Sequence, residues 1–191
     1  MNTQLPASST IEADKQFLAK YPSREEMELA YCPRFWSYAL SHSTRAYLAV
    51  CPTLSSLDRI YGNGATVHWI RVQLVAIFQL SSSKDTGVVD EIKAFASLLA
   101  ATMSTYKLTE LMVFFAGYAA GIFGTTDYQT FDLRRISAAF LGEFRKERTQ
   151  QLAAIKRERQ QLINEQKDAR DRANAISYED YLRGKTSSLS K

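Results

Sequence analysis

The chain has 191 residues, of which 46% are hydrophobic and 23% charged, and its formal net charge is +4. This length and apolar content suit one hydrophobic core with an appendage rather than several domains. The mild charge permits a nucleic-acid partner without requiring one, and two cysteines are too few for a disulfide framework. We therefore expect a reducing, intracellular compartment.

The amino-terminal residues are polar, and no basic segment followed by an apolar one opens the chain. Residues 1–9 are predicted to be disordered, and no secretion signal is expected. The apolar segment from Leu111 to Gly124 has fourteen residues, fewer than the roughly 17–25 that a membrane-spanning helix needs. We expect a cytoplasmic protein of a bacterial host cell that makes no contact with a membrane.

Capping residues, prolines and glycines divide the first half of the chain into short helices. Ser23 and Glu26 have the capping-box spacing, and Pro33 and Pro52 each suit the first turn of a helix. The pair Gly62 and Gly64 can end a helix by adopting positive φ. The predicted helices cover residues 10–20, 23–31, 33–48, 52–61, 66–78 and 88–103.

The apolar segment from Leu111 to Gly124 carries large side chains on all sides of a helix. Such a helix must be surrounded by others, so we predict that it is the central helix of the core. Gly117, Gly121 and Gly124 follow a spacing that lets a second helix approach closely, or else the helix breaks near Gly124.

A long helix is predicted from Asp132 to about Ser177, because no breaker interrupts this stretch. Its apolar positions thin out after Arg148, and Arg159 and Gln166 fall where a coiled-coil partner would pack. This makes a poor coiled-coil seam, so the arm is expected to project or to pair weakly, as a possible homo-oligomer contact. The predicted organisation is residues 1–9 disordered, 10–142 helical body, 143–176 charged helix, and 177–191 short motif and frayed tail.

Catalytic groups are scarce. His42 and His68 are the only histidines, and neither has a cysteine or carboxylate at metal-ligand spacing. His68 lies on a largely apolar helix and is expected to be buried with a hydrogen-bonded partner. We predict no catalytic residue, metal or cofactor, and therefore no enzyme.

The charged helix offers two kinds of contact. From Glu143 to Ala173 it has nine Lys or Arg residues and six Asp or Glu residues, and it lacks the aromatic residues of a stacking platform for single strands. The charges could simply be solvated and paired four residues apart along the helix. Alternatively they bind DNA phosphates, and the candidates are Arg134, Arg135, Arg145, Lys146, Arg148, Lys156, Arg157 and Arg159.

A protein partner is the contact that we favour. Arginine makes strong directional bonds to carboxylates, and a short motif with capping-box spacing follows the helix. The predicted partner-binding residues are Arg145, Arg148, Arg159, Tyr178, Tyr181 and Leu182.

Four parts of the chain carry a resemblance to a known group of proteins. They are Lys107-Leu-Thr-Glu-Leu-Met-Val-Phe-Phe115, Gly121-Ile-Phe-Gly124, Asp132 and Ile136 with Phe144-Arg-Lys-Glu-Arg148, and Ser177-Tyr-Glu-Asp-Tyr-Leu182. Together with the charged helix, they resemble small helical proteins of Bacteroidetes phages and conjugative elements, whose layout is similar to that of phage helicase loaders and other replication accessory factors. The resemblance implies an accessory or adaptor protein of a mobile element that binds a replication protein, such as the replicative helicase. The expected fold is an all-α, compact multi-helix bundle with a long C-terminal helical arm.

Overall fold

The computed structural model describes residues 7–78, 86–124 and 133–174, and within them the chain is helical, as predicted. The only β-type pairing in this part is an isolated bridge between Thr53 and Lys107. Contacts divide the described residues into a body that ends at Arg148 and a C-terminal segment that begins at Thr149. The helical elements are α1 (Ala7–Lys20), α2 (Arg24–Ala30), η1 (Pro33–Phe35), α3 (Trp36–Ser41), α4 (Ser43–Leu48), α5 (Ser56–Tyr61), α6 (Ala65–Ile77), α7 (Thr86–Thr102), α8 (Leu108–Ala119), α9 (Leu133–Ala139), η2 (Phe140–Phe144) and α10 (Arg145–Asn174).

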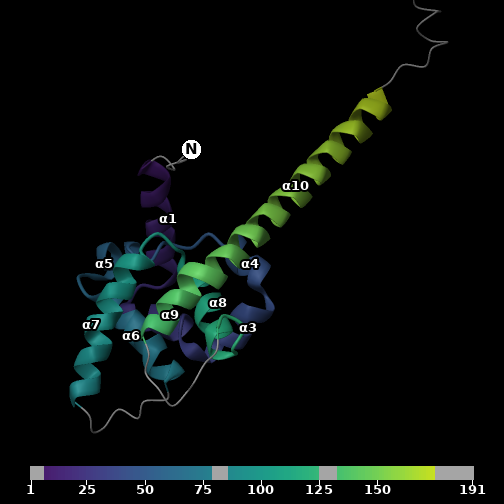
Figure 1. Cartoon of the computed structure of the whole chain (residues 1–191). Helices are drawn as coiled ribbons and strands as arrows, with labels where there is room; N and C mark the ends of the chain where they lie inside the picture. Colours follow the sequence, from purple (N-terminus) through teal and green to yellow (C-terminus); the bar gives the residue numbers. More distant parts are fainter. Residues whose placement is uncertain (1–6, 79–85, 125–132, 175–191) are drawn as a thin grey trace, which may run out of the picture. The chain divides into compact units, whose positions relative to one another are not determined.

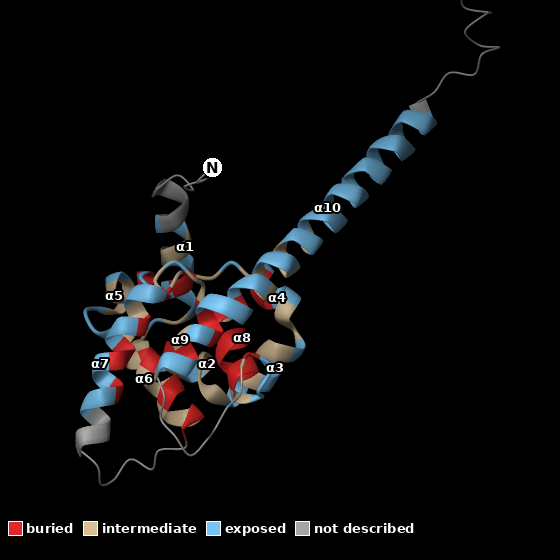
Figure 2. Ribbon diagram, in the orientation of Figure 1, coloured by how far each residue is buried: buried red, intermediate tan, exposed pale blue. Residues whose placement is uncertain are grey.

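Helix α8 is the centre of the body, which confirms the prediction from its continuous apolar sequence. Every residue from Glu110 to Tyr118 is buried, and α8 packs against α3, α4 and α6 (Figure 2). The ring of Phe114 lies 5.1 Å from that of Phe140 and 5.2 Å from that of Phe144. Burying each such side chain stabilises the fold by roughly 1.5–3 kcal/mol, so these aromatic contacts join α8 to the last helix of the body.

Helix α8 ends at Ala119, before the apolar segment does, because the backbone reverses at Gly121. The φ of Gly121 is +73°, and the amide of Ile122 donates to the carbonyl of Gly117 at 2.8 Å. This is a Schellman motif, which favours glycine at its left-handed position. A Cβ at residue 117 would overlap the ring of Phe123. Gly117 therefore makes room for the loop that follows α8, and of the two alternatives the structure shows the helix ending shortly before Gly124.

The predicted helix 33–48 is divided into η1, α3 and α4. At the break, Ser41 Oγ donates to the carbonyl oxygen of Tyr38 at 3.1 Å, and His42 Nδ1 lies 3.1 Å from the same oxygen. Side chains that bond nearby carbonyls compete with the helical ladder. His42 adopts φ −120° and ψ 37°, and α4 begins in a new direction.

The buried side-chain amide of Gln73 links the end of α2 and the start of α3 to α6. Gln73 is fully buried, and its Oε1 accepts from Trp36 Nε1 at 2.8 Å. Its Nε2 donates to the carbonyl of Tyr31 at 3.1 Å, and that carbonyl also accepts from Trp69 Nε1 at 3.0 Å. Because each buried polar group finds a partner, this cluster contributes to stability rather than reducing it.

The long C-terminal helix is confirmed, since α9, η2 and α10 follow one another without interruption. Its one irregularity is η2, a π-helical turn. Ile136, Phe140 and Phe144 are fully buried and recur every fourth residue, a spacing that drifts by about 40° per step around an α-helix. The wider π turn keeps Phe140 and Phe144 on one face, where their rings stack at 5.6 Å.

No helix in the described ranges is both long enough and apolar enough to span a membrane. Residues 1–6, 79–85, 125–132 and 175–191 lie outside the description, and with them the expected motif of Tyr178, Tyr181 and Leu182. Residues 7–9, predicted to be disordered, belong to α1.

Candidate protein interface

The predicted arginines fall into two environments. Arg134, Arg135, Arg145 and Lys146 are exposed residues of the body, and Lys156, Arg157 and Arg159 are exposed residues of the C-terminal segment. Arg148 is different, because its side chain is only 28% exposed. The structure therefore separates Arg148 from the other candidates for partner or phosphate contact.

Arg148 pairs with a carboxylate of the core. Its Nη2 donates to Glu110 Oε1 at 2.9 Å, and its guanidinium lies 4.9 Å from the centre of the Tyr106 ring. Glu110 is 1% exposed, and its Oε2 accepts from the amide of Lys107 at 3.2 Å, as an N-terminal cap of α8. A buried carboxylate needs such partners. Arg148 is thus engaged inside the body. The three-residue spacing of Lys107 and Glu110 is the sequence feature that could have indicated the cap to which Arg148 binds.

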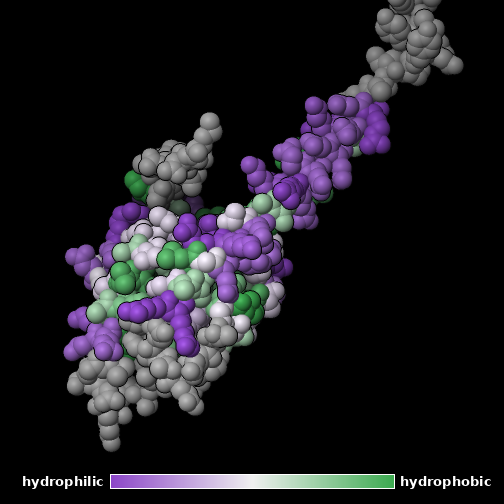
Figure 3. All heavy atoms as spheres, in the orientation of Figure 1, coloured by the Kyte–Doolittle hydropathy of each residue, from purple (hydrophilic) through white to green (hydrophobic). Residues whose placement is uncertain are grey.

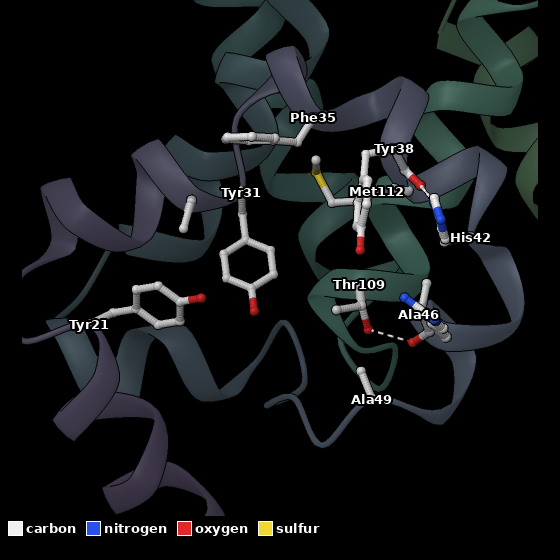
Figure 4. Close-up of a pocket in the computed structure, with 12 residues that line it drawn as sticks. Tyr21, Tyr31, Phe35, Tyr38, His42, Ala46, Ala49, Thr109 and Met112 are labelled. Carbon is white, nitrogen blue, oxygen red and sulfur yellow. Dashed lines mark hydrogen bonds between the residues drawn. The ribbon is translucent and has the colours of Figure 1, made fainter.

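An aromatic pocket of about 330 Å³ opens on the body (Figure 4). Tyr21, Tyr31 and Phe35 line one part of it, and Tyr38 stacks on His42 at 4.3 Å in another. No sequence pattern predicts this pocket, because its walls come from Tyr21, which follows α1, and from residues in or next to α2, η1, α3, α4 and α8.

The chemistry of the pocket is that of a binding surface. Burial raises the pKa of the Tyr31 hydroxyl, and burial also raises the pKa of the Cys51 thiol that donates to it at 3.7 Å. A thiol with a raised pKa is a poor nucleophile. The lining residues include Arg45 but no carboxylate that could orient His42 as a base. The pocket suits an apolar group better than a reaction.

The second histidine, His68, contacts a carboxylate on the protein surface. His68 is not buried as expected. Its side chain is 39% exposed, and its Nε2 lies 3.5 Å from Glu28, which also binds Arg24. His68 lies on the polar side of α6. The prediction that it is buried was wrong because it rested on the apolar composition of the whole helix. The described residues contain no cluster of three or more His, Cys, Asp or Glu that could hold a metal ion.

Six of the charged side chains on the C-terminal part of α10 lie on two faces, and Arg157, Asp168, Asp171 and Arg172 lie on one side between those faces. At 100° per residue, one arc of about 80° holds four basic side chains, which we call the basic face: Lys156, Arg159, Lys167 and Arg170. Glu158 and Glu165 lie about 150° away and form the acidic face. The hydrophilic surface is visible along this helix in Figure 3. Pairing four residues apart is open to Lys167 with Asp171 and to Asp168 with Arg172, but not to Glu158 or Glu165, which lie opposite the basic face.

Apolar side chains lie between these faces, at Ile155 and Leu162, and within the arc of the basic face, at Leu152 and Ile163. Leu162 is 53% exposed and Ile163 is 49% exposed, while Leu152 and Ile155 are half-buried. Exposed apolar side chains in a cluster indicate a contact surface more than isolated ones do. The C-terminal segment therefore combines an apolar strip with charges of opposite sign on its two flanks.

Comparisons with known proteins found no matching protein family, no matching curated protein and no matching solved structure.

Proposed function

We propose that this chain is a non-enzymatic accessory protein that acts by binding another protein, and that α10 is its binding element. The observation that carries this proposal is the exposed Leu162, which lies between the acidic and the basic face, together with the exposed Ile163 within the arc of the basic face. An apolar strip with a charged flank on each side is the usual form of a helix that packs on a protein partner.

In this proposal the protein belongs to a mobile element and its partner is a replication protein, with the replicative helicase as one candidate, as the resemblance described above implies. Arg145 and Arg159 remain the arginine anchors of the expected interface, whereas Arg148 has its carboxylate within the body. The motif of Tyr178, Tyr181 and Leu182 extends this surface in the proposal.

DNA binding is the second candidate function. It is favoured by the basic face, since no carboxylate falls within the arc of Lys156, Arg159, Lys167 and Arg170. Phosphate contact has no use for Leu162 and Ile163, however, and its affinity falls with salt by roughly 0.9 log units per log of salt for each phosphate neutralised. The two functions therefore depend on different side chains and respond differently to salt.

The test compares two matched variants of the full chain, Leu162→Ser/Ile163→Ser and Lys156→Gln/Lys167→Gln. Each is used to capture proteins from nuclease-treated lysate, with the bound proteins identified by mass spectrometry, and to bind duplex DNA in a fluorescence anisotropy titration. We expect the apolar variant to lose a captured protein that the unchanged chain retains after nuclease treatment. Salt-sensitive DNA binding that only the lysine variant weakens would instead establish the second function.

A further inference from the structure

The C-terminal segment of α10 has a regular seven-residue register. With positions named a to g, the a and d positions face a coiled-coil partner. In α10 these positions form a seam, with Leu152, Arg159, Gln166 and Ala173 at a, and Ile155, Leu162 and Ala169 at d. From Arg159 to Ala173 every seam side chain is exposed, whereas Leu152 and Ile155 are half-buried. The seam is therefore available to another helix chiefly from Arg159 onward.

We infer that the seam binds a second copy of this chain, with the two α10 helices parallel and in register. The inference rests on the proposed function, because the seam belongs to the same protein-binding helix, on which a second copy is a partner in addition to the proposed replication protein. A second copy is the partner because acidic and basic side chains beside the seam of one helix would meet the opposite charges of an identical helix.

The first observation is the sign of the charges at positions e and g. In a parallel pair, each g residue meets the e residue five positions later in the second copy. Glu165 at g then meets Arg170 at e, and the two-fold symmetry forms this ion pair twice. In an antiparallel pair e meets e and g meets g. The charged e residues, Lys156 and Arg170, are both basic, and of the charged g residues Glu158 and Glu165 are acidic and Arg172 alone is basic. Charge therefore selects the parallel arrangement.

The second observation is that this arrangement accounts for the two residues that look out of place. A side chain at a packs beside the g residue that precedes its counterpart, so Arg159 lies next to Glu158 of the second copy. A side chain at d packs beside the following e residue, so Leu162 lies next to Ile163 of the second copy. The exposed Ile163 thus extends the apolar contact, and the seam arginine gains a carboxylate.

The expected pairing is weak, because only Leu152, Ile155 and Leu162 are large apolar residues within the described seam. Dimerisation should therefore depend on concentration, and sedimentation velocity of the full chain should show it. Glu165→Arg alone and Arg170→Glu alone should each weaken dimerisation by about tenfold, since two exposed ion pairs become like-charge contacts. The double variant Glu165→Arg/Arg170→Glu should restore it.

Disulfide cross-linking tests the direction of the helices. In the full chain with Cys32→Ser and Cys51→Ser, Leu162→Cys should form a disulfide-linked dimer, because d residues of a parallel, in-register pair face each other. Arg157→Cys is the matched control, since residue 157 lies on the outer f position. Should the serine background fail to fold, the charge variants test the same pairing with both cysteines retained.

Three results would overturn the inference. The chain could stay monomeric at all concentrations, a cysteine at residue 162 could cross-link no better than one at residue 157, or the double charge variant could fail to restore dimerisation. If the chain is monomeric while protein capture still requires Leu162 and Ile163, the proposed function stands and only the second copy is wrong. If capture and pairing are both absent and DNA binding remains, the proposed function itself is wrong.

Discussion

Glu110 is a buried carboxylate whose two oxygens bind groups from different parts of the chain. One accepts from the amide of Lys107 at the start of α8, and the other accepts from Arg148 at the end of the body. Breaking a buried pair by removing one partner is strongly destabilising, because the remaining charge is left without compensation. The contribution of Arg148 is therefore best measured by removing it with and without Glu110.

Arg148→Met should lower the free energy of unfolding by about 2–4 kcal/mol, a little less than for a fully buried pair because Arg148 retains some solvent access. The double variant Arg148→Met/Glu110→Gln should recover more than half of the loss, since the neutral amide needs no cation. Urea unfolding followed by circular dichroism gives these values. Arg157→Ala, an exposed change on the same helix, should stay within about 0.5 kcal/mol. An equal effect of both arginine changes would contradict the assigned role of Arg148.

Tyr47 should make the folded protein less stable as the pH becomes alkaline. Burial, with help from the charges of Glu147 and Glu110, raises the pKa of its hydroxyl from 10.0 to about 12. The unfolded chain therefore ionises first, and the stabilisation, complete below pH 10, is lost as the pH rises from about 10 to about 12. We expect Tyr47→Phe to reduce this loss by about 2–3 kcal/mol, measured by urea unfolding at both ends of that window. Tyr38→Phe, at a tyrosine that is 58% exposed, is the control for removing a hydroxyl group.

Among the helical elements, the end of α8 depends on one glycine. The ring of Phe123 occupies the space where a Cβ of residue 117 would lie, whereas nothing lies within 4 Å of a Cβ at Gly142. Gly117→Ala should therefore destabilise the fold by about 1–3 kcal/mol through overpacking, despite the better helix propensity of alanine. Gly142→Ala should be neutral or slightly stabilising. Thermal unfolding of both variants decides, and a neutral Gly117→Ala would show that Phe123 can move aside at little cost.

For the whole molecule, the boundary of the body follows from Phe144 and Arg148. The sequence predicts that the body ends at residue 142, but Phe144 is fully buried and Arg148 binds Glu110. A chain that ends after Gln151 should keep a cooperative thermal transition, whereas one that ends after Gly142 should lose it or melt far lower. Far-UV circular dichroism melts of the two truncations provide the comparison. Similar transitions would place the boundary where the sequence predicts it.

Much of the fold could be predicted because its signals are local. The continuous apolar run marked α8 as central, and Ser23, which caps α2 by accepting from the amide of Glu26, was recognised from its spacing. The break at His42 and the π turn at Phe140 were missed, since both depend on competition between the helical ladder and other contacts. The strict four-residue spacing of Ile136, Phe140 and Phe144 was an available signal of that turn. The pocket could not be predicted, because its walls come from distant segments.

The shared carboxylate of Glu110 also has a consequence for local opening of the fold. Whenever Arg148 detaches, the oxygen that caps α8 is left with an unbalanced buried charge, and it must leave the core or be protonated. Amide hydrogens at the start of α8 and those around residue 148 should then exchange with solvent in one cooperative step rather than independently. The Glu110 side chain thus couples the local unfolding of two segments, the start of α8 and the residues around Arg148, which are more than thirty residues apart in sequence.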